Sequence, residues 1–149
     1  MTEQVSWALN RADSRTFSGE AHSTLLAGAD TEVPVKLYFV RFASGARTFW
    51  HTHSGPQILL IKAGRCRYQR EGGQIQEASA GDSVRFEAGE RHWHGGTPSE
   101  GTEHIAINLT AGETDWQEEV SESDYAGNGD GRSSEGGDAS ALFASAPPA

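Results

Sequence analysis

A series of short β-forming runs separated by glycine turns is the feature that most limits the fold of this chain. The runs are rich in branched and aromatic residues, and they span 35–42, 48–53, 58–61, 65–69, 82–86 and 103–108. Short strands with turn signals about every 8 to 12 residues are typical of a sandwich or a barrel. Since no helical periodicity interrupts the series, the sequence predicts an all-β fold.

The composition divides the chain into three parts. Residues 1–22 lack clear periodicity and form an N-terminal arm, in which the run Val5–Leu9 could add an edge strand. Residues 23–125 form the barrel, and Ser121 is predicted to cap one helical turn near its end. Residues 126–149 consist mainly of Gly, Ser, Ala, Asp and Pro. Because such a segment buries too little surface to offset its ordering entropy, we predict a disordered tail.

Charge and length exclude several classes of protein. The 149 residues suffice for one domain, and the net charge is -9. Residues 113–138 hold nine acidic residues and one basic residue, which leaves twelve acidic and eleven basic residues elsewhere. Without a basic stripe, nucleic-acid binding is not expected. No apolar run reaches the ~18 residues of a membrane span, no signal peptide is evident, and Cys66 is alone, so we predict a cytoplasmic protein without membrane partners.

The histidines are placed where a metal site would need them. His51 and His53 form an H-x-H pair, and alternation along a strand turns both imidazoles to one face. Gln57 keeps the same parity across the bend at 54–56, and His92 on a later strand completes a nitrogen and oxygen ligand set. Imidazole and amide oxygen suit Mn, Fe, Co, Ni, Cu and Zn without sharp discrimination. Four protein ligands leave two open positions on an octahedral ion.

The glycine and histidine spacing resembles the two motifs of the cupin superfamily. The chain reads G-x5-H-x-H-x3-Q-x6-G from Gly45, and G-x5-E-x-G-x2-H from Gly81. It departs from the family by Gln57 in place of the usual Glu, by Glu87 in place of Pro and by Gly96 where Asn is frequent. Within the cupins, three runs and Gln57 are similar to the small manganese-dependent bacterial hydroxynitrile lyases; the runs are Gly45–Thr48, Trp50–His53 and Glu90–Gly95.

The resemblance covers roughly residues 35–125 and carries several expectations. It implies a single-domain jelly-roll barrel (a double-stranded β-helix), assembled as a homodimer. It implies metal-dependent cleavage or synthesis of a cyanohydrin, with His104 as general base. Mn(II) is the favoured metal and Fe(II) the next, while Zn, Co and Ni also suit the ligands. With Gln57 in place of a carboxylate, the ligand set is neutral and the ion keeps its full charge.

Strand parity predicts the lining of a substrate pocket. The inward positions are Phe49, Tyr38, Val40, Leu59, Ile61, His94 and Asn108. Such an apolar wall favours a small hydrophobic or aromatic substrate. Trp50 and Trp93 have the opposite parity and should face a packed layer or a dimer contact. Two roles stay open at this point: His94 could lie at the pocket rim, and His104 could be a core histidine bonded to a backbone carbonyl.

Three other functions are compatible with the same ligands. One is an iron-dependent dioxygenase, the second a sugar-acid isomerase or ring-opening enzyme, and the third a non-catalytic barrel that binds a small molecule. No G-x-S-x-G, Walker or dinucleotide-binding pattern occurs, so covalent serine chemistry and nucleotide chemistry have no support.

Overall fold

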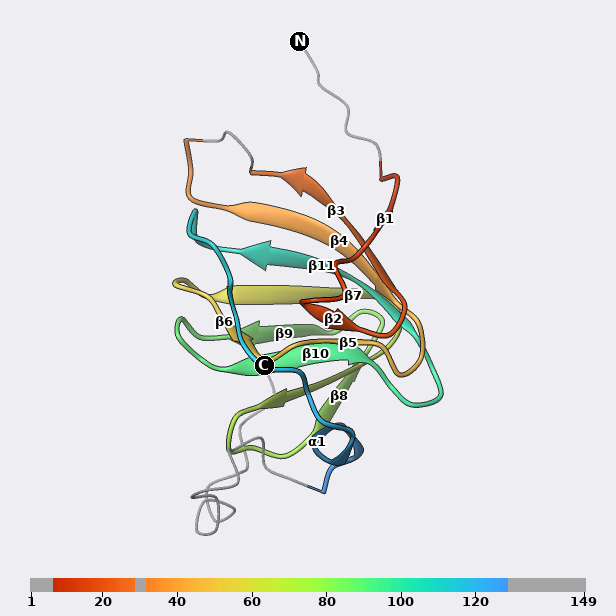
Figure 1. Cartoon of the computed structure of the whole chain (residues 1–149). Coiled ribbons are helices and arrows are strands. Elements are labelled where there is room, and N and C mark those ends of the chain that lie inside the picture. Colours follow the sequence, from red (N-terminus) through yellow and green to blue (C-terminus); the bar gives the residue numbers. More distant parts are fainter. Residues whose placement is uncertain (1–6, 29–31, 129–149) are drawn as a thin grey trace.

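A computed structural model of the chain describes residues 7–28 and 32–128. Twelve strands and one short helix form within them (Figure 1). The strands are β1 (Asn10–Arg11), β2 (Phe17–Ser18), β3 (Ala21–Ala27), β4 (Lys36–Phe42), β5 (Arg47–Thr48), β6 (His51–Thr52), β7 (Gln57–Arg70), β8 (Gln76–Ser79), β9 (Ser83–Phe86), β10 (His92–Gly96), β11 (Thr102–Asn108) and β12 (Asp115–Trp116). The helix α1 spans Glu122–Ala126.

The strands form one curled sheet in the order β1-β3-β4-β11-β7-β10-β5-β2, and all recorded pairings are antiparallel. β7 belongs to both halves of the curl. Its first part pairs with β11 and β9, and its second part pairs with β10 and β8 (Figure 1). The predicted all-β jelly-roll architecture is therefore confirmed.

The long β7 corrects the prediction of two strands separated by a turn at Gly64. The strand runs for 14 residues without a break. Gly64 has a φ of 71°, and a Cβ there would collide with the carbonyl oxygen of Gly101. Glycine is thus required by the close approach of a neighbouring backbone, and it lets one continuous strand bend from one half of the sheet into the other.

Three other boundaries differ from the prediction. The expected strand at 48–53 is two short strands, β5 and β6, with Phe49 and Trp50 outside both. Trp50 N donates to the carbonyl of Glu118, a partner outside the sheet ladders. The barrel gains β3 within the segment assigned partly to the arm. The edge strand expected at Val5–Leu9 falls partly outside the described residues; its described part forms no strand, and Trp7 packs on Phe39 with ring centroids 4.8 Å apart.

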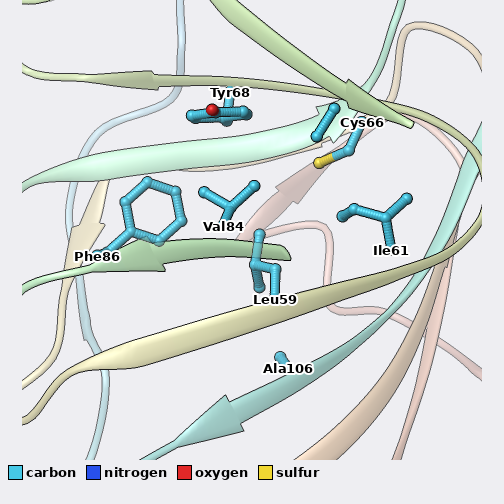
Figure 2. Packing of buried hydrophobic residues seen from close by; sticks show 8 residues of the cluster. Leu59, Ile61, Cys66, Tyr68, Val84, Phe86 and Ala106 are labelled. Atoms are coloured by element: carbon cyan, nitrogen blue, oxygen red, sulfur yellow. The ribbon is translucent and has the colours of Figure 1, made fainter. Parts of the chain in front are cut away.

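The barrel interior holds a hydrophobic cluster. Its buried members are Leu59, Ile61, Cys66, Tyr68, Ala78, Val84, Phe86 and Ala106 (Figure 2). They come from β7, β8, β9 and β11, so packing here joins both halves of the sheet. A second cluster contains Trp50, Trp93, Val120 and Tyr125. The two tryptophans thus face a packed layer, as their parity predicted.

The chain after the barrel is tied back to it by α1. Ser121 Oγ accepts a hydrogen bond from Asp124 N, which confirms the predicted cap. The guanidinium of Arg47 lies over the ring of Tyr125, 4.3 Å from the ring centroid. The Tyr125 hydroxyl donates a hydrogen bond to the carbonyl of Gly96. The helix extends into the segment predicted as a tail, and Gly127 closes it in the left-handed conformation. The rest of that predicted tail, 129–149, lies outside the described residues.

Within the described part of the chain, the structure has no helix that is long and apolar enough to cross a membrane.

Candidate metal centre

Three histidines converge on one point in the barrel: His51 on β6, His53 directly after β6, and His92 on β10. The potential ligand atoms of His51, His53 and His92 all lie within 4.8 Å of one another, and all three side chains are buried. His51 and His92 are directly opposite each other, because β6 and β10 pair at these residues. His53 follows β6 and keeps its ring close, with its centroid 4.9 Å from that of His51. The sheet pairing therefore brings together motifs that are about 40 residues apart in the sequence.

Backbone carbonyls fix which nitrogen of each ring is available. His51 Nδ1 lies 2.8 Å from the carbonyl oxygen of Phe49, and His92 Nδ1 lies 2.8 Å from that of Glu90. A carbonyl can only accept, so Nδ1 carries the hydrogen in both rings and Nε2 has a free lone pair. Among the described residues, the buried Nε2 of His53 has no hydrogen-bond partner. His51 and His92 thus each offer an unprotonated Nε2 to the same small space, and His53 brings an Nε2 that no hydrogen bond within the described residues occupies.

Gln57 adds an oxygen to the three nitrogens. Its Nε2 donates to Asn108 Oδ1 at 2.8 Å, which turns Oε1 toward His92 Nε2 at 3.0 Å. Both of these facing atoms are acceptors, so their contact is repulsive unless something positive lies beside them. Ligands at right angles on a metal with bonds of about 2.1 Å are about 3 Å apart. The contact therefore fits a shared cation, and the donor set fits a divalent transition metal.

Burial keeps the histidines neutral. It is the first cause that lowers the pKa of His51 to about 3 and the pKa of His53 to about 4. The pKa of His92 is lowered well below its usual value by burial and by the neighbouring His51. Because a metal binds the unprotonated ring, these rings are ready as ligands without first losing a proton. The ring of Phe86, a core residue labelled in Figure 2, stacks on the ring of His92.

A second pair of histidines lies beside this centre. His94 Nδ1 is 3.1 Å from His104 Nε2, and both rings are buried. His94 lines the pocket, whereas His104 is not among its lining residues. His104, the predicted general base, lies on β11 and contacts the pocket through His94, so its role as base stays a prediction. Burial lowers the pKa of His104 to about 4. Among the described residues, neither His94 Nε2 nor His104 Nδ1 has a hydrogen-bond partner.

The pocket in front of these histidines has a volume of about 170 Å³. Its lining includes His51, His53, Gln57, Phe17, Ser23, Tyr38, Val40, Thr48, His94, Ala106, Asn108, Glu113, Thr114 and Trp116. Four of the seven predicted wall residues therefore reach it: Tyr38, Val40, His94 and Asn108.

The other three predicted wall residues lie elsewhere. Leu59 and Ile61 point inward as expected, but they belong to the closed hydrophobic cluster beyond the pocket (Figure 2). Phe49 is half-buried and does not line the pocket, because the chain leaves the strand between β5 and β6 and the alternation of faces is lost. Parity alone gives the correct face of a strand, but not the depth of a residue along the barrel.

Several pocket residues escaped prediction because they come from outside the histidine motifs. Phe17 is on β2, and Glu113, Thr114 and Trp116 follow β11. Thr114 Oγ1 lies 3.3 Å from His53 Nδ1, and the Trp116 ring lies 4.6 Å from the His51 ring. The only available signal was the aromatic character of Phe17 and Trp116 in otherwise polar segments.

Comparison with known proteins agrees with this geometry. The family profile described as "Cupin domain" matches residues 38–114. An (R)-mandelonitrile lyase of Granulicella tundricola is 46% identical over 88 residues, which is 58% of this chain and 67% of that protein. The solved structure of a cupin-like protein from Thermotoga maritima has a TM-score of 0.76 at 31% identity, covering 83% of this chain and 95% of that one.

One further solved structure shows how widely the fold is used. A putative acetylacetone dioxygenase from Methylibium petroleiphilum has a TM-score of 0.63 at 17% identity, and the match covers 79% of this chain and 83% of that one. At this level of identity the likeness concerns the fold alone.

Proposed function

Because this chain belongs to the cupin family, we propose that it is a metal-dependent lyase that cleaves or forms cyanohydrins of small aromatic or hydrophobic aldehydes. The observation that carries the proposal is the combination of a neutral three-histidine, one-amide centre with a second histidine pair beside it. The similarity to an (R)-mandelonitrile lyase supports the same reaction class.

His51, His53, Gln57 and His92 would hold the metal, with Mn(II) favoured and Fe(II) next. When bound, the ion supplies a positive charge that orients an oxygen or a nitrile of the substrate and stabilises developing negative charge. The neutral ligands leave that charge uncancelled. Asn108 keeps the oxygen of Gln57 directed at the centre, because it accepts from the amide nitrogen.

We assign the proton transfer of the reaction to His94 and His104. In the proposed cleavage, the substrate hydroxyl gives its proton to His94 Nε2, the oxygen electrons form the carbonyl, and the carbon–carbon electron pair leaves with cyanide. His94 Nδ1–H would donate to His104 Nε2, since these atoms are 3.1 Å apart. His104 then fixes the tautomer of His94 and shares the charge that the proton brings. In synthesis the same steps run in reverse.

The decisive experiment compares His94→Gln and His104→Gln with His22→Gln as a control. His22 lies on β3 and does not line the pocket. We expect the first two variants to retain the metal while cleavage of mandelonitrile by the manganese-loaded protein falls by about 10² or more. The control should keep both. Retention of most activity in His94→Gln would refute its role as base, and a wild type without activity with manganese, iron, cobalt or zinc would refute the lyase proposal.

A further inference from the structure

The mouth of the pocket is formed by a segment that the histidine motifs do not include. Glu113, Thr114 and Trp116 lie between β11 and the end of β12, and all three line the pocket. β12 pairs with β6, with Trp116 opposite His51. The end of the segment, Asp115–Trp116, is thus held by strand pairing to β6, which carries a metal ligand. Thr114 contacts His53 and Glu113 lines the pocket directly before this paired end.

Aromatic rings line the pocket beside this segment. The rings of Phe17 and Trp116 have centroids 5.7 Å apart and planes at 49°, and Trp116 in turn contacts the ring of His51. Tyr38 and Val40 contribute to the lining from β4. A flat apolar group in the pocket would lie against these rings, beside the histidines that line the same pocket. The lining therefore suits an arene better than a sugar or a flexible chain.

Glu113 brings a negative charge to the same pocket. It is exposed, whereas His51, His53 and His94 are buried, so Glu113 lies at the open side and the histidines at the closed side. No hydrogen bond or ion pair to the Glu113 carboxylate is seen within residues 7–28 and 32–128. Its charge reaches Tyr38, because it adds to the effect of burial in raising the pKa of that phenol.

We propose that Glu113 makes the pocket mouth a subsite for a cationic or hydrogen-bond-donating group carried by an aromatic substrate. The proposal rests on the proposed metal centre, which would hold the opposite end of the substrate. An ionised carboxylate can only accept hydrogen bonds, so an ammonium or hydroxyl group is the complementary partner. The substrate class is then an arene with an oxygen-donor group at one end and a donor group at the other.

The test uses probes that need no turnover. The 3- and 4-(aminomethyl)benzoates carry a carboxylate for the metal and an ammonium group for Glu113, and the 3- and 4-ethylbenzoates have the same shape without the charge. Binding of each to the manganese-loaded full chain is measured by calorimetry. We expect the better-placed aminomethyl isomer to bind about fivefold more tightly than its ethyl counterpart. Glu113→Gln should remove this preference, and Glu20→Gln, which loses the same charge away from the pocket, should keep it.

Each result decides between the subsite and its absence. Equal affinities of the paired probes in the wild type, no binding of any probe, or a preference that survives Glu113→Gln would overturn the proposal. A preference that depends on Glu113 would support it even if the protein cleaved no cyanohydrin. Failure of the lyase reaction and failure of the subsite are therefore separate outcomes.

Discussion

The ring of Phe86 stacks on the ring of His92, with centroids 3.8 Å apart and planes only 14° from parallel. Phe86 is fully buried on β9, and His92 is a proposed metal ligand on β10. The hydrophobic core therefore packs directly against a proposed metal ligand. One ring face of His92 is fixed by packing and its Nδ1 by the carbonyl of Glu90.

This stacking predicts that core packing sets metal affinity. We expect Phe86→Leu to weaken Mn(II) binding by about tenfold, because looser packing lets the His92 ring rotate away from the ligand geometry. The measurement is a competition titration against a chelator. Val84→Ala, another truncation in the same cluster, is the matched control for lost stability. Equal weakening in both variants would show that general destabilisation, and not the stacked ring, controls the affinity.

The contact between Gln57 and His92 predicts the effect of a charge change. We expect Gln57→Glu to bind Mn(II) more tightly, because a carboxylate adds attraction that the amide lacks. The same variant should bind benzoate less well, since the ligand set then cancels part of the metal charge. Asn108→Leu should weaken metal binding by removing the acceptor that orients Gln57. Calorimetry with metal and with benzoate checks both directions, and a Gln57→Glu protein with weaker metal binding would contradict the charge argument.

The buried His104 predicts acid sensitivity of the metal-free protein. Its pKa is about 4 in the fold and about 6.5 in an unfolded chain. Between these values the unfolded state binds a proton that the native state does not, so the free energy of unfolding falls as the pH falls. The slope from this group approaches about 1.4 kcal/mol per pH unit. The free energy of unfolding, measured with urea from pH 7 to 4.5, should change less steeply with pH in His104→Gln, by about 1.4 kcal/mol per pH unit. An unchanged slope would argue against a neutral His104.

The exposed edge of β3 bears on the expected homodimer. β1 covers β3 only at His22 and Ser23, so Thr24 to Ala27 have no strand partner on that side within the described residues. Such an edge can extend a sheet into a second copy. We expect sedimentation to give a dimer and Thr24→Lys to shift it toward the monomer, because a charge at the edge opposes pairing. A wild-type monomer at micromolar concentration would contradict the expectation.

The sequence predicted the parts of this molecule that depend on local spacing. The H-x-H pair and Gln57 lie together as their spacing indicated, because alternation acts over a few residues, whereas the place of His92 beside them was expected from the resemblance to the two cupin motifs. Contacts between distant segments were not predictable in the same way. Phe17 and Trp116 meet beside His51 only because β2 and β12 are added to the sheet from opposite ends of the chain. At the break between β5 and β6, Phe49 N donates to the carbonyl of Thr16 and Trp50 N to that of Glu118, and no local pattern predicts these contacts.

The two-sided pairing of β7 has a consequence for how the protein folds. Its first part aligns Gln57 with Asn108, and its second part aligns Arg70 with His92. Pairings between such distant residues form slowly, so we expect folding in milliseconds to seconds. The ligand set is complete only once β6 and β10 have paired, and a metal ion can bind it only after that step. Metal should therefore slow unfolding far more than it speeds folding. It would stabilise the folded barrel without directing how the barrel forms.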